Sequence, residues 1–134
     1  MQAIQLHEDK FLKISWEEKG RVIGIDWKEA TSSMTDEDFK AALTLFAGHV
    51  EHRRARGILV DVSRFRHKPG PDVMPWRVKN ISNRYAVAGV KRQAFLFPQG
   101  AQIPASMKQS APGEEFLTGA FDDVQKAEAW LTAG

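Results

Sequence analysis

The sequence contains no cysteine, which excludes disulfide bonds, thiolate catalysis and zinc sites built from cysteine. No run of apolar residues approaches the ~20 that a transmembrane helix needs, and the amino terminus lacks the basic and apolar regions of a signal peptide. Neither sign of charge dominates, because 19 Lys and Arg face 17 Asp and Glu and leave a net charge of +2. Such a balance gives no indication of nucleic-acid binding. We therefore expect a cytoplasmic protein with no membrane span and no nucleic-acid partner.

The motifs that carry catalysis in known enzyme classes are also missing. The chain has no Gly-x-Ser-x-Gly elbow, no Gly-rich phosphate loop and no dinucleotide-binding fingerprint. Ser63 has no neighbour identifiable as its base, so it fails the first requirement of a nucleophile. Asp61 stands at the end of a strand, where we expect it to accept hydrogen bonds from the loop that follows. The sequence therefore predicts a non-enzymatic protein with no catalytic residue and no cofactor.

What the chain does contain is the composition of an ordinary globular domain. Hydrophobic residues make up 43% and charged residues 27% of the sequence, and these values are usual for such a domain. The 134 residues are enough to bury a substantial core without covalent cross-links. There are no internal repeats, so we expect one domain over residues 1–134.

The first part of the chain predicts a β-hairpin. Apolar and polar residues alternate between Leu12 and Trp16, and a second strand at residues 22–27 follows a short turn. Ile4 and Leu6 predict a further short strand before the hairpin. The strands should therefore lie side by side with one face buried.

A helix should follow this hairpin. Thr35 precedes three acidic residues and is expected to cap the helix. Apolar residues recur along one face of it at helical spacing: Phe39, Leu43, Phe46 and Val50. The carboxyl end is basic, and Gly57 is expected to end the helix in the left-handed conformation.

Strands and helices then alternate to the end of the chain. We expect a buried strand at 58–62, a helix that Pro71 and Asp72 begin and Gly89 ends, a strand at 92–97, an irregular segment at 99–113 with one helical turn near 105–109, a strand at 116–120, and a last helix capped by Asp122. The buried face of the second helix should consist of Met74, Val78, Ile81 and Tyr85. This order predicts an α/β fold with a mixed sheet, an amino-terminal hairpin and about four helices.

Three short patterns accompany this order: Thr-Asp-Glu-Asp-Phe at 35–39, Ile-Leu-Val-Asp-Val-Ser at 58–63, and Phe-Asp-Asp-Val-Gln-Lys-Ala-Glu-Ala-Trp-Leu at 121–131. Together they resemble the SpoIIAA-like fold of STAS domains and bacterial anti-sigma-factor antagonists, and especially the uncharacterised SpoIIAA-like group labelled STAS/SEC14. The antagonists of that family carry a phosphorylated serine in an Asp-Ser-Ser-Gly-type turn after the central strand. Here no Ser or Thr lies between Ser63 and Ser82. The resemblance therefore implies a SpoIIAA-like fold and a non-catalytic binding module, but not the phosphoswitch.

The loop after the central strand is the main candidate for a binding site, because ligands of open α/β sheets dock beyond the carboxyl ends of the strands. The candidate residues are four that can carry positive charge, the serine before them and a tryptophan in the next helix: Ser63, Arg64, Arg66, His67, Lys68 and Trp76. A phosphate, a carboxylate or an acidic protein surface would suit these cations. Alternatively, the charges are only solvated and Trp76 packs on the sheet.

A metal site is a weaker alternative. His49 and His52 share a helix face and have the spacing of two metal ligands. A metal ion needs at least one more ligand, and the sequence places neither His7 nor His67 near them. Cations at a helix carboxyl end account for the same residues, so we expect no metal ion.

Two functions remain as hypotheses. The first is a regulatory module that uses the loop and helix after the central strand to bind another protein or a second copy of itself, since a homodimer would cover an open sheet edge. It predicts an exposed apolar patch near Trp76 and no deep cavity. The alternative is a carrier or sensor of a small apolar or anionic molecule between the second helix and residues 98–113, with Ile103 and Met107 folded over it. It predicts a pocket of several hundred Å³.

Overall fold

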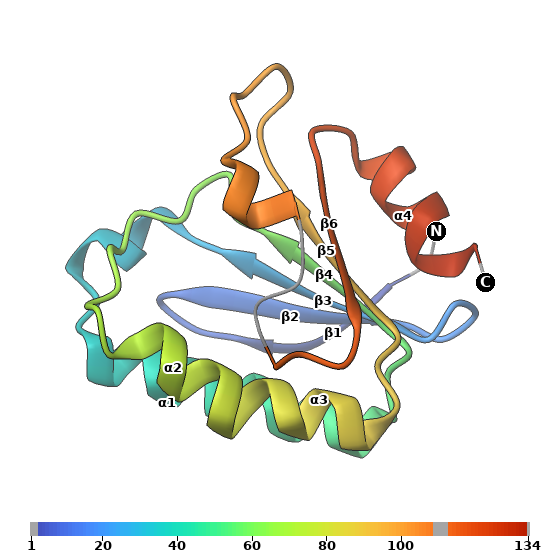
Figure 1. Cartoon of the computed structure of the whole chain (residues 1–134), viewed down its shortest axis with the longest axis horizontal. Coiled ribbons are helices and arrows are strands. Elements are labelled where there is room, and N and C mark those ends of the chain that lie inside the picture. Colours follow the sequence, from blue (N-terminus) through green and yellow to red (C-terminus); the bar gives the residue numbers. More distant parts are fainter. Residues whose placement is uncertain (1–2, 109–112, 134) are drawn as a thin grey trace.

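The computed structural model describes residues 3–108 and 113–133, and across these residues the chain forms one six-stranded sheet (Figure 1). The strands lie in the order β1-β2-β3-β4-β5-β6, so the order in the sheet is the order in the chain. They are β1 (Ile4–Glu8), β2 (Leu12–Glu17), β3 (Val22–Trp27), β4 (Gly57–Asp61), β5 (Arg92–Leu96) and β6 (Leu117–Phe121). β1, β2 and β3 pair antiparallel, whereas β3 to β6 pair parallel. The predicted mixed α/β fold with its amino-terminal hairpin is confirmed.

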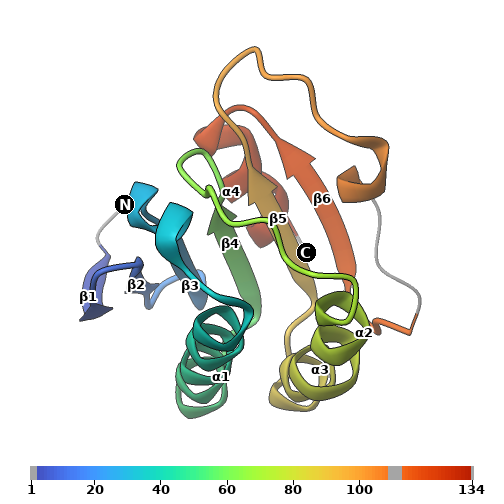
Figure 2. The same cartoon turned by 90° about the vertical axis from the view of Figure 1, so that its left-hand side faces the viewer.

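Helices cover both faces of this sheet. Figure 2 shows α1 (Asp36–Arg53), α2 (Val73–Arg77) and α3 (Asn83–Ala88) along one face, and α4 (Val124–Thr132) on the other. A π-helical stretch, Val78–Ser82, joins α2 to α3, so the two form one interrupted helix. The short 3₁₀ turns η1 (Glu29–Ser33) and η3 (Ala105–Lys108) complete the elements of the described residues. About four helices were expected, and four helical segments of this kind are present in these ranges.

The amino end of α1 follows the prediction, and its carboxyl end does not. The Thr35 hydroxyl accepts a hydrogen bond from the Asp38 N–H, and the Asp38 carboxylate accepts one from the Thr35 N–H, so the two residues form a capping box. At the other end Arg54, not Gly57, takes the left-handed conformation, with φ of 52°. Gly57 is the first residue of β4, and a Cβ there would contact the side chains of Leu131 and Val22 at 3.4 Å. The prediction for Gly57 was wrong because the chain makes its left-handed turn three residues earlier, at Arg54, and Gly57 already belongs to the strand.

Two other predicted helix starts are also corrected. The carboxylate of Asp123, not of Asp122, accepts hydrogen bonds from the first N–H groups of α4. The Asp122 carboxylate instead accepts one from the Gly100 N–H. Asp72 stands before α2 but makes no capping hydrogen bond with its side chain. Neighbouring aspartates cannot be told apart as caps by sequence, because the one with extended backbone takes that role.

The buried face of the second helix differs from the prediction in its first turn. Ile81 and Tyr85 are buried as expected, but Met74 is 52% exposed and Val73 is buried in its place. The π-helical stretch has more residues per turn than an α-helix. If residues are counted back from Tyr85 at α-helical spacing, the count reaches Met74. The wider turn of the π-helix shifts the buried position by one residue, to Val73.

The sheet separates two hydrophobic clusters of unequal size. The larger one fills the face under α1, α2 and α3 and includes Ile25, Phe46 and Val60. The smaller one lies under α4 and includes Ala94 and Ala127. No helix in the described part of the chain is long and apolar enough to span a membrane.

Candidate functional site

A pocket of about 470 Å³ opens between the sheet and the helices of its larger hydrophobic face. Its floor is a row of side chains that lie in register on three parallel strands, Ile25 of β3, Val60 of β4 and Phe95 of β5. Side chains of a strand alternate between its two faces, so these positions share one face. Small-molecule sites usually occupy about 300–1,000 Å³, and this pocket falls within that range.

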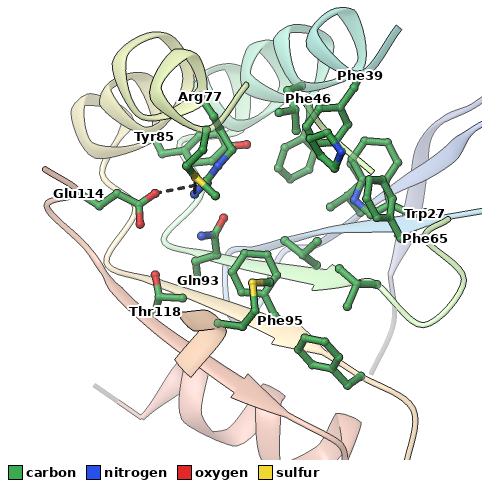
Figure 3. A pocket seen from close by; sticks show the side chains of 18 of the residues that line it. Trp27, Phe39, Phe46, Phe65, Arg77, Tyr85, Gln93, Phe95, Glu114 and Thr118 are labelled. Atoms are coloured by element: carbon green, nitrogen blue, oxygen red, sulfur yellow. Dashed lines mark hydrogen bonds and ion pairs between the residues drawn. The ribbon is translucent and has the colours of Figure 1, made fainter. Parts of the chain in front are cut away.

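One end of the pocket is aromatic. The rings of Trp27, Phe39 and Phe65 lie with centroids 5.1–5.6 Å apart, a spacing typical of packed aromatic side chains. Phe46 stands beside them on α1 and meets the ring of Tyr85 edge-on at 6.0 Å. Figure 3 shows this group on the opposite side of the pocket from its charged residues. An apolar ring or chain would be well accommodated here.

The other end is polar and buried. Arg77 Nη1 lies 3.3 Å from Glu114 Oε2, and their side chains are only 15% and 1% exposed. The Ser82 hydroxyl donates a second hydrogen bond, of 2.6 Å, to the same carboxylate oxygen. Tyr85 is fully buried beside this pair, and burial raises the pKa of its phenol well above the usual value. The charges of this end are therefore balanced within the protein.

Two further polar groups face the pocket without a partner. Gln93 is 3% exposed, and its Nε2 has no hydrogen-bond partner in the parts of the chain that the structure describes. The same holds for the buried Thr118 Oγ1. Gln93 and Thr118 are register partners in β5 and β6 and both line the pocket. Native proteins rarely leave buried polar atoms unsatisfied, so this is a place where a ligand atom would be stabilised.

The exposed part of the pocket lining comes from two loops and the start of α2. Its exposed residues are Pro69 of the loop after β4, Pro104 of the segment after β5, and Met74 of α2. Met107 of η3 also lines the pocket, as the carrier hypothesis expected. Ile103, which the same hypothesis placed over the ligand, is not part of the lining within the described residues.

The six residues predicted as a binding site lie close to this pocket in sequence but outside its described lining. Asp61 accepts a hydrogen bond of 2.9 Å from the Ser63 N–H and another from the Ser63 hydroxyl, as predicted for a strand-ending aspartate. The Arg66 N–H donates to the Thr31 hydroxyl at 2.8 Å, which fastens the loop to η1. Phe65, directly before Arg66, is the residue of this loop segment that lines the pocket.

His67 is held by the helix that follows η1. Its Nε2 lies 2.9 Å from Asp36 Oδ1, and its side chain is 9% exposed. The Asp36 carboxylate also accepts hydrogen bonds from the Gly70 N–H. These contacts, the Gly70 N–H first and His67 second, hold the pKa of Asp36 below its usual value. His67 therefore serves as an anchor of the loop.

The remaining predicted residues have separate surroundings. Arg64 and Lys68 are exposed, and Trp76 is partly buried with the Lys40 ammonium 5.4 Å from its ring centroid. A cation over a tryptophan face is a favourable arrangement at the surface. Whether these residues bind anything stays a prediction.

His49 of α1 lies near His7 of β1, a proximity that was not predicted from the sequence. The rings of His7 and His49 lie with centroids 6.3 Å apart, and burial together with the His7 charge lowers the pKa of His49. His7 Nε2 is 2.7 Å from Asp9 Oδ2. Over residues 3–108 and 113–133 there is no group of three or more side chains arranged to hold a metal ion.

A second depression, of about 510 Å³, lies at the amino ends of the parallel strands. Most of its lining residues are cationic: Lys19, Arg21, Arg56, Lys91 and Arg92. Arg21 Nη2 donates to the Arg53 and Arg54 carbonyls, and Arg92 Nη1 donates to the Trp130 carbonyl. These are carbonyls at helix ends, where arginine is a common partner. Helix capping thus accounts for part of this positive charge.

Comparisons with protein-family models, with curated proteins and with solved structures find no match to this chain. The site must therefore be interpreted from its own geometry.

The polar end of the pocket was not predicted from the sequence. Gln93 occupies the same strand face as Phe95 and Phe97, and this alternation was a signal that a glutamine would point into the core. Arg77 and Glu114 are 37 positions apart by their numbers in the sequence, and nothing in the local patterns around them links the two.

Proposed function

We propose that this protein binds a small, mainly apolar molecule in the pocket between the sheet and helices α1 to α3, as a carrier or sensor. The observation that carries the proposal is the pocket itself, with its volume of about 470 Å³ and its aromatic lining. Burial of apolar ligand surface contributes about 25 cal/mol per Å², so such a lining supplies most of the binding energy.

The surroundings of Trp76 favour this hypothesis over the protein-binding module. That module required an exposed apolar patch near Trp76 and no deep cavity. Trp76 is partly buried and lies under Lys40, while the pocket lies on the inner side of the same helix. Met74 is exposed nearby, but it also lines the pocket.

Binding without catalysis remains part of the proposal. Arg77 and Glu114 are titratable groups within the pocket, but they are paired with each other, and Glu114 also accepts from Ser82. A general acid or base must lie within hydrogen-bonding distance of the substrate atom whose proton it gives or takes. Groups that neutralise each other in this way are better suited to hold the pocket in shape.

The resemblance to SpoIIAA-like domains stays a hypothesis beside this proposal. What supports it is the order of strands and helices, together with the three short sequence patterns. A binding role in the pocket does not depend on it.

The test uses phenylnaphthylamine, a neutral dye whose fluorescence rises when it leaves water for an apolar site. Val62 lines the pocket, and Val62→Phe should weaken dye binding at least about tenfold by filling it. The matched control is Val87→Phe, the same change at a residue of α3 that is 90% exposed, and it should leave binding unchanged. Thermal unfolding of both variants would verify that they remain folded.

A third variant separates the pocket from the loop predicted from sequence. Arg64→Ala combined with Arg66→Ala should leave dye binding unchanged, because neither side chain is part of the described pocket lining. The proposal fails if wild-type protein gives no saturable signal, or if the Val62→Phe and Val87→Phe variants bind equally well.

A further inference from the structure

The polar end of the pocket contains a donor that the described parts of the protein do not satisfy. Within residues 3–108 and 113–133, Gln93 Nε2 is buried and unpartnered, and so is the hydroxyl of Thr118. Leaving such a group unpaired costs more than a typical hydrogen bond contributes net. The cost is recovered when a ligand atom with a lone pair reaches both groups.

The sheet brings these two groups together. Gln93 of β5 and Thr118 of β6 are direct partners in the parallel ladder, and neighbouring strands lie about 4.8 Å apart. Both side chains point to the pocket face (Figure 3). An amide N–H and a hydroxyl at this spacing can donate to one oxygen atom, as the donors of an oxyanion hole do.

The charged residues near Gln93 and Thr118 determine whether the ligand oxygen that they bind is charged or neutral. Arg77 is the pocket's cation among the described lining residues, and its charge is already balanced by the 1%-exposed Glu114 side chain. A carboxylate ligand would bring a second negative charge next to Glu114 in a site largely shielded from water, which is costly without a further cation. An ammonium group would be repelled by the positive charge of Arg77 and could not accept the hydrogen bond that Gln93 Nε2 offers. A neutral hydrogen-bond acceptor avoids both the repulsion from Glu114 and the repulsion from Arg77.

We infer that the ligand is a neutral amphipathic molecule with a carbonyl oxygen at one end. The carbonyl accepts hydrogen bonds from Gln93 Nε2 and the Thr118 hydroxyl, and the apolar body lies among Trp27, Phe39, Phe65 and Phe95. This inference rests on the proposed function, since it names the chemistry of a ligand in the same pocket.

The experiment compares three probes that share a naphthalene ring and differ in one substituent. Acetylnaphthalene carries a neutral carbonyl, ethylnaphthalene has no polar atom, and naphthoate is anionic. Each competes with phenylnaphthylamine for wild-type protein. Acetylnaphthalene should bind about fivefold to thirtyfold more tightly than ethylnaphthalene, as expected for one or two net hydrogen bonds, and naphthoate should bind more weakly than acetylnaphthalene.

Variants then assign the difference to the two residues. Gln93→Met and Thr118→Val keep side-chain size while removing the donors, and each should reduce the preference for acetylnaphthalene over ethylnaphthalene. Ethylnaphthalene should bind as well as before, which shows that the pocket is intact. Gln5→Met, the same change on the exposed part of β1, is the matched control and should leave the preference unchanged.

The possible failures can be told apart. If the dye binds and Val62→Phe blocks it, but acetylnaphthalene and ethylnaphthalene compete equally, the inference about the carbonyl is overturned while the proposed function stands. Stronger competition by naphthoate than by acetylnaphthalene overturns the neutrality of the ligand. If the dye itself fails to bind, the proposed function is overturned first.

Discussion

The two faces of the sheet are both apolar, but they are packed differently. Under α4 the small residues Ala94 and Ala127 pack beside Leu131, and the Phe121 and Trp130 rings lie against them with centroids 5.5 Å apart. A Cβ at Gly119 would lie 3.0 Å from the Phe121 ring and 3.3 Å from Trp130. Under α1 to α3 the contacts are made by large aromatic side chains, and a hollow of about 470 Å³ remains.

This difference teaches that bulky residues do not guarantee a filled core. Large side chains leave space between a helix and a sheet where their shapes do not interlock, whereas small residues such as Ala94 and Ala127 let the backbones approach closely. The face with the larger apolar cluster is therefore the one that contains the pocket.

The largest effect that we expect concerns the ion pair inside the pocketed face. Arg77→Met should destabilise the protein by about 3 kcal/mol, because it leaves the buried Glu114 carboxylate without the Arg77 charge. Chemical denaturation at neutral pH would measure the loss. Adding Glu114→Gln to the same protein should recover most of it, and a double variant as unstable as the single one would contradict this explanation.

The contrast between the faces can be tested directly with one enlarged residue on each. Ala127→Leu, at a fully buried position under α4, should destabilise the protein by about 1–3 kcal/mol because the face has no room for it. Val60→Leu, on the floor of the pocket, should change the free energy of unfolding by less than about 1 kcal/mol. Urea unfolding of both variants gives the comparison. Equal losses would mean that the hollow is not available to side chains.

The smallest effect concerns acid and the loop at the open side of the pocket. The pKa of Asp36 is lowered from 3.8 by the Gly70 N–H and by His67. Its folded pKa lies below its unfolded one, so its contribution to stability is present above pH 3.8 and is lost as the pH falls through the folded pKa. Asp36→Asn should therefore lower the thermal midpoint at neutral pH, and the difference from wild type should close in acid.

A neighbouring residue provides the control for this pH dependence. Glu37→Gln changes a side chain that is 88% exposed and lies 3.9 Å from Lys40. Exposed pairs of this kind contribute little, so its thermal midpoint should follow the wild-type curve at every pH. If the thermal midpoint of Glu37→Gln varies with pH in the same way as that of Asp36→Asn, the contacts of Asp36 do not explain the pH dependence.

The elements of the fold could be predicted because their signals are local. Alternation fixed the strands that carry Ile25 and Phe95, and the residues around Thr35 fixed the start of α1. Gly57 was misassigned because a glycine after a basic segment is typical of a helix end, whereas the left-handed residue that ends α1 is Arg54, a residue type that gives no such signal.

The site was less accessible to prediction. The loop of residues 63–68 was selected for its cations, whose role stays a prediction, and Phe65, the residue of this loop that lines the pocket, was not among the predicted residues. Gln93, Thr118 and Glu114 become a polar end only when β5, β6 and the segment before β6 come together. Such a group depends on tertiary distances, and no pattern within one element encodes them.

The agreement between chain order and sheet order has a consequence for how the protein is made. Each strand pairs with the strand synthesised before it, so no formed sheet must open to admit a later strand, and folding can advance from the amino terminus during translation. Glu114 and Thr118 belong to the last part of this sequence of events. A ribosome-bound chain can thus hold most of its sheet before the polar end of the pocket exists, so the pocket is among the last features of the fold to form.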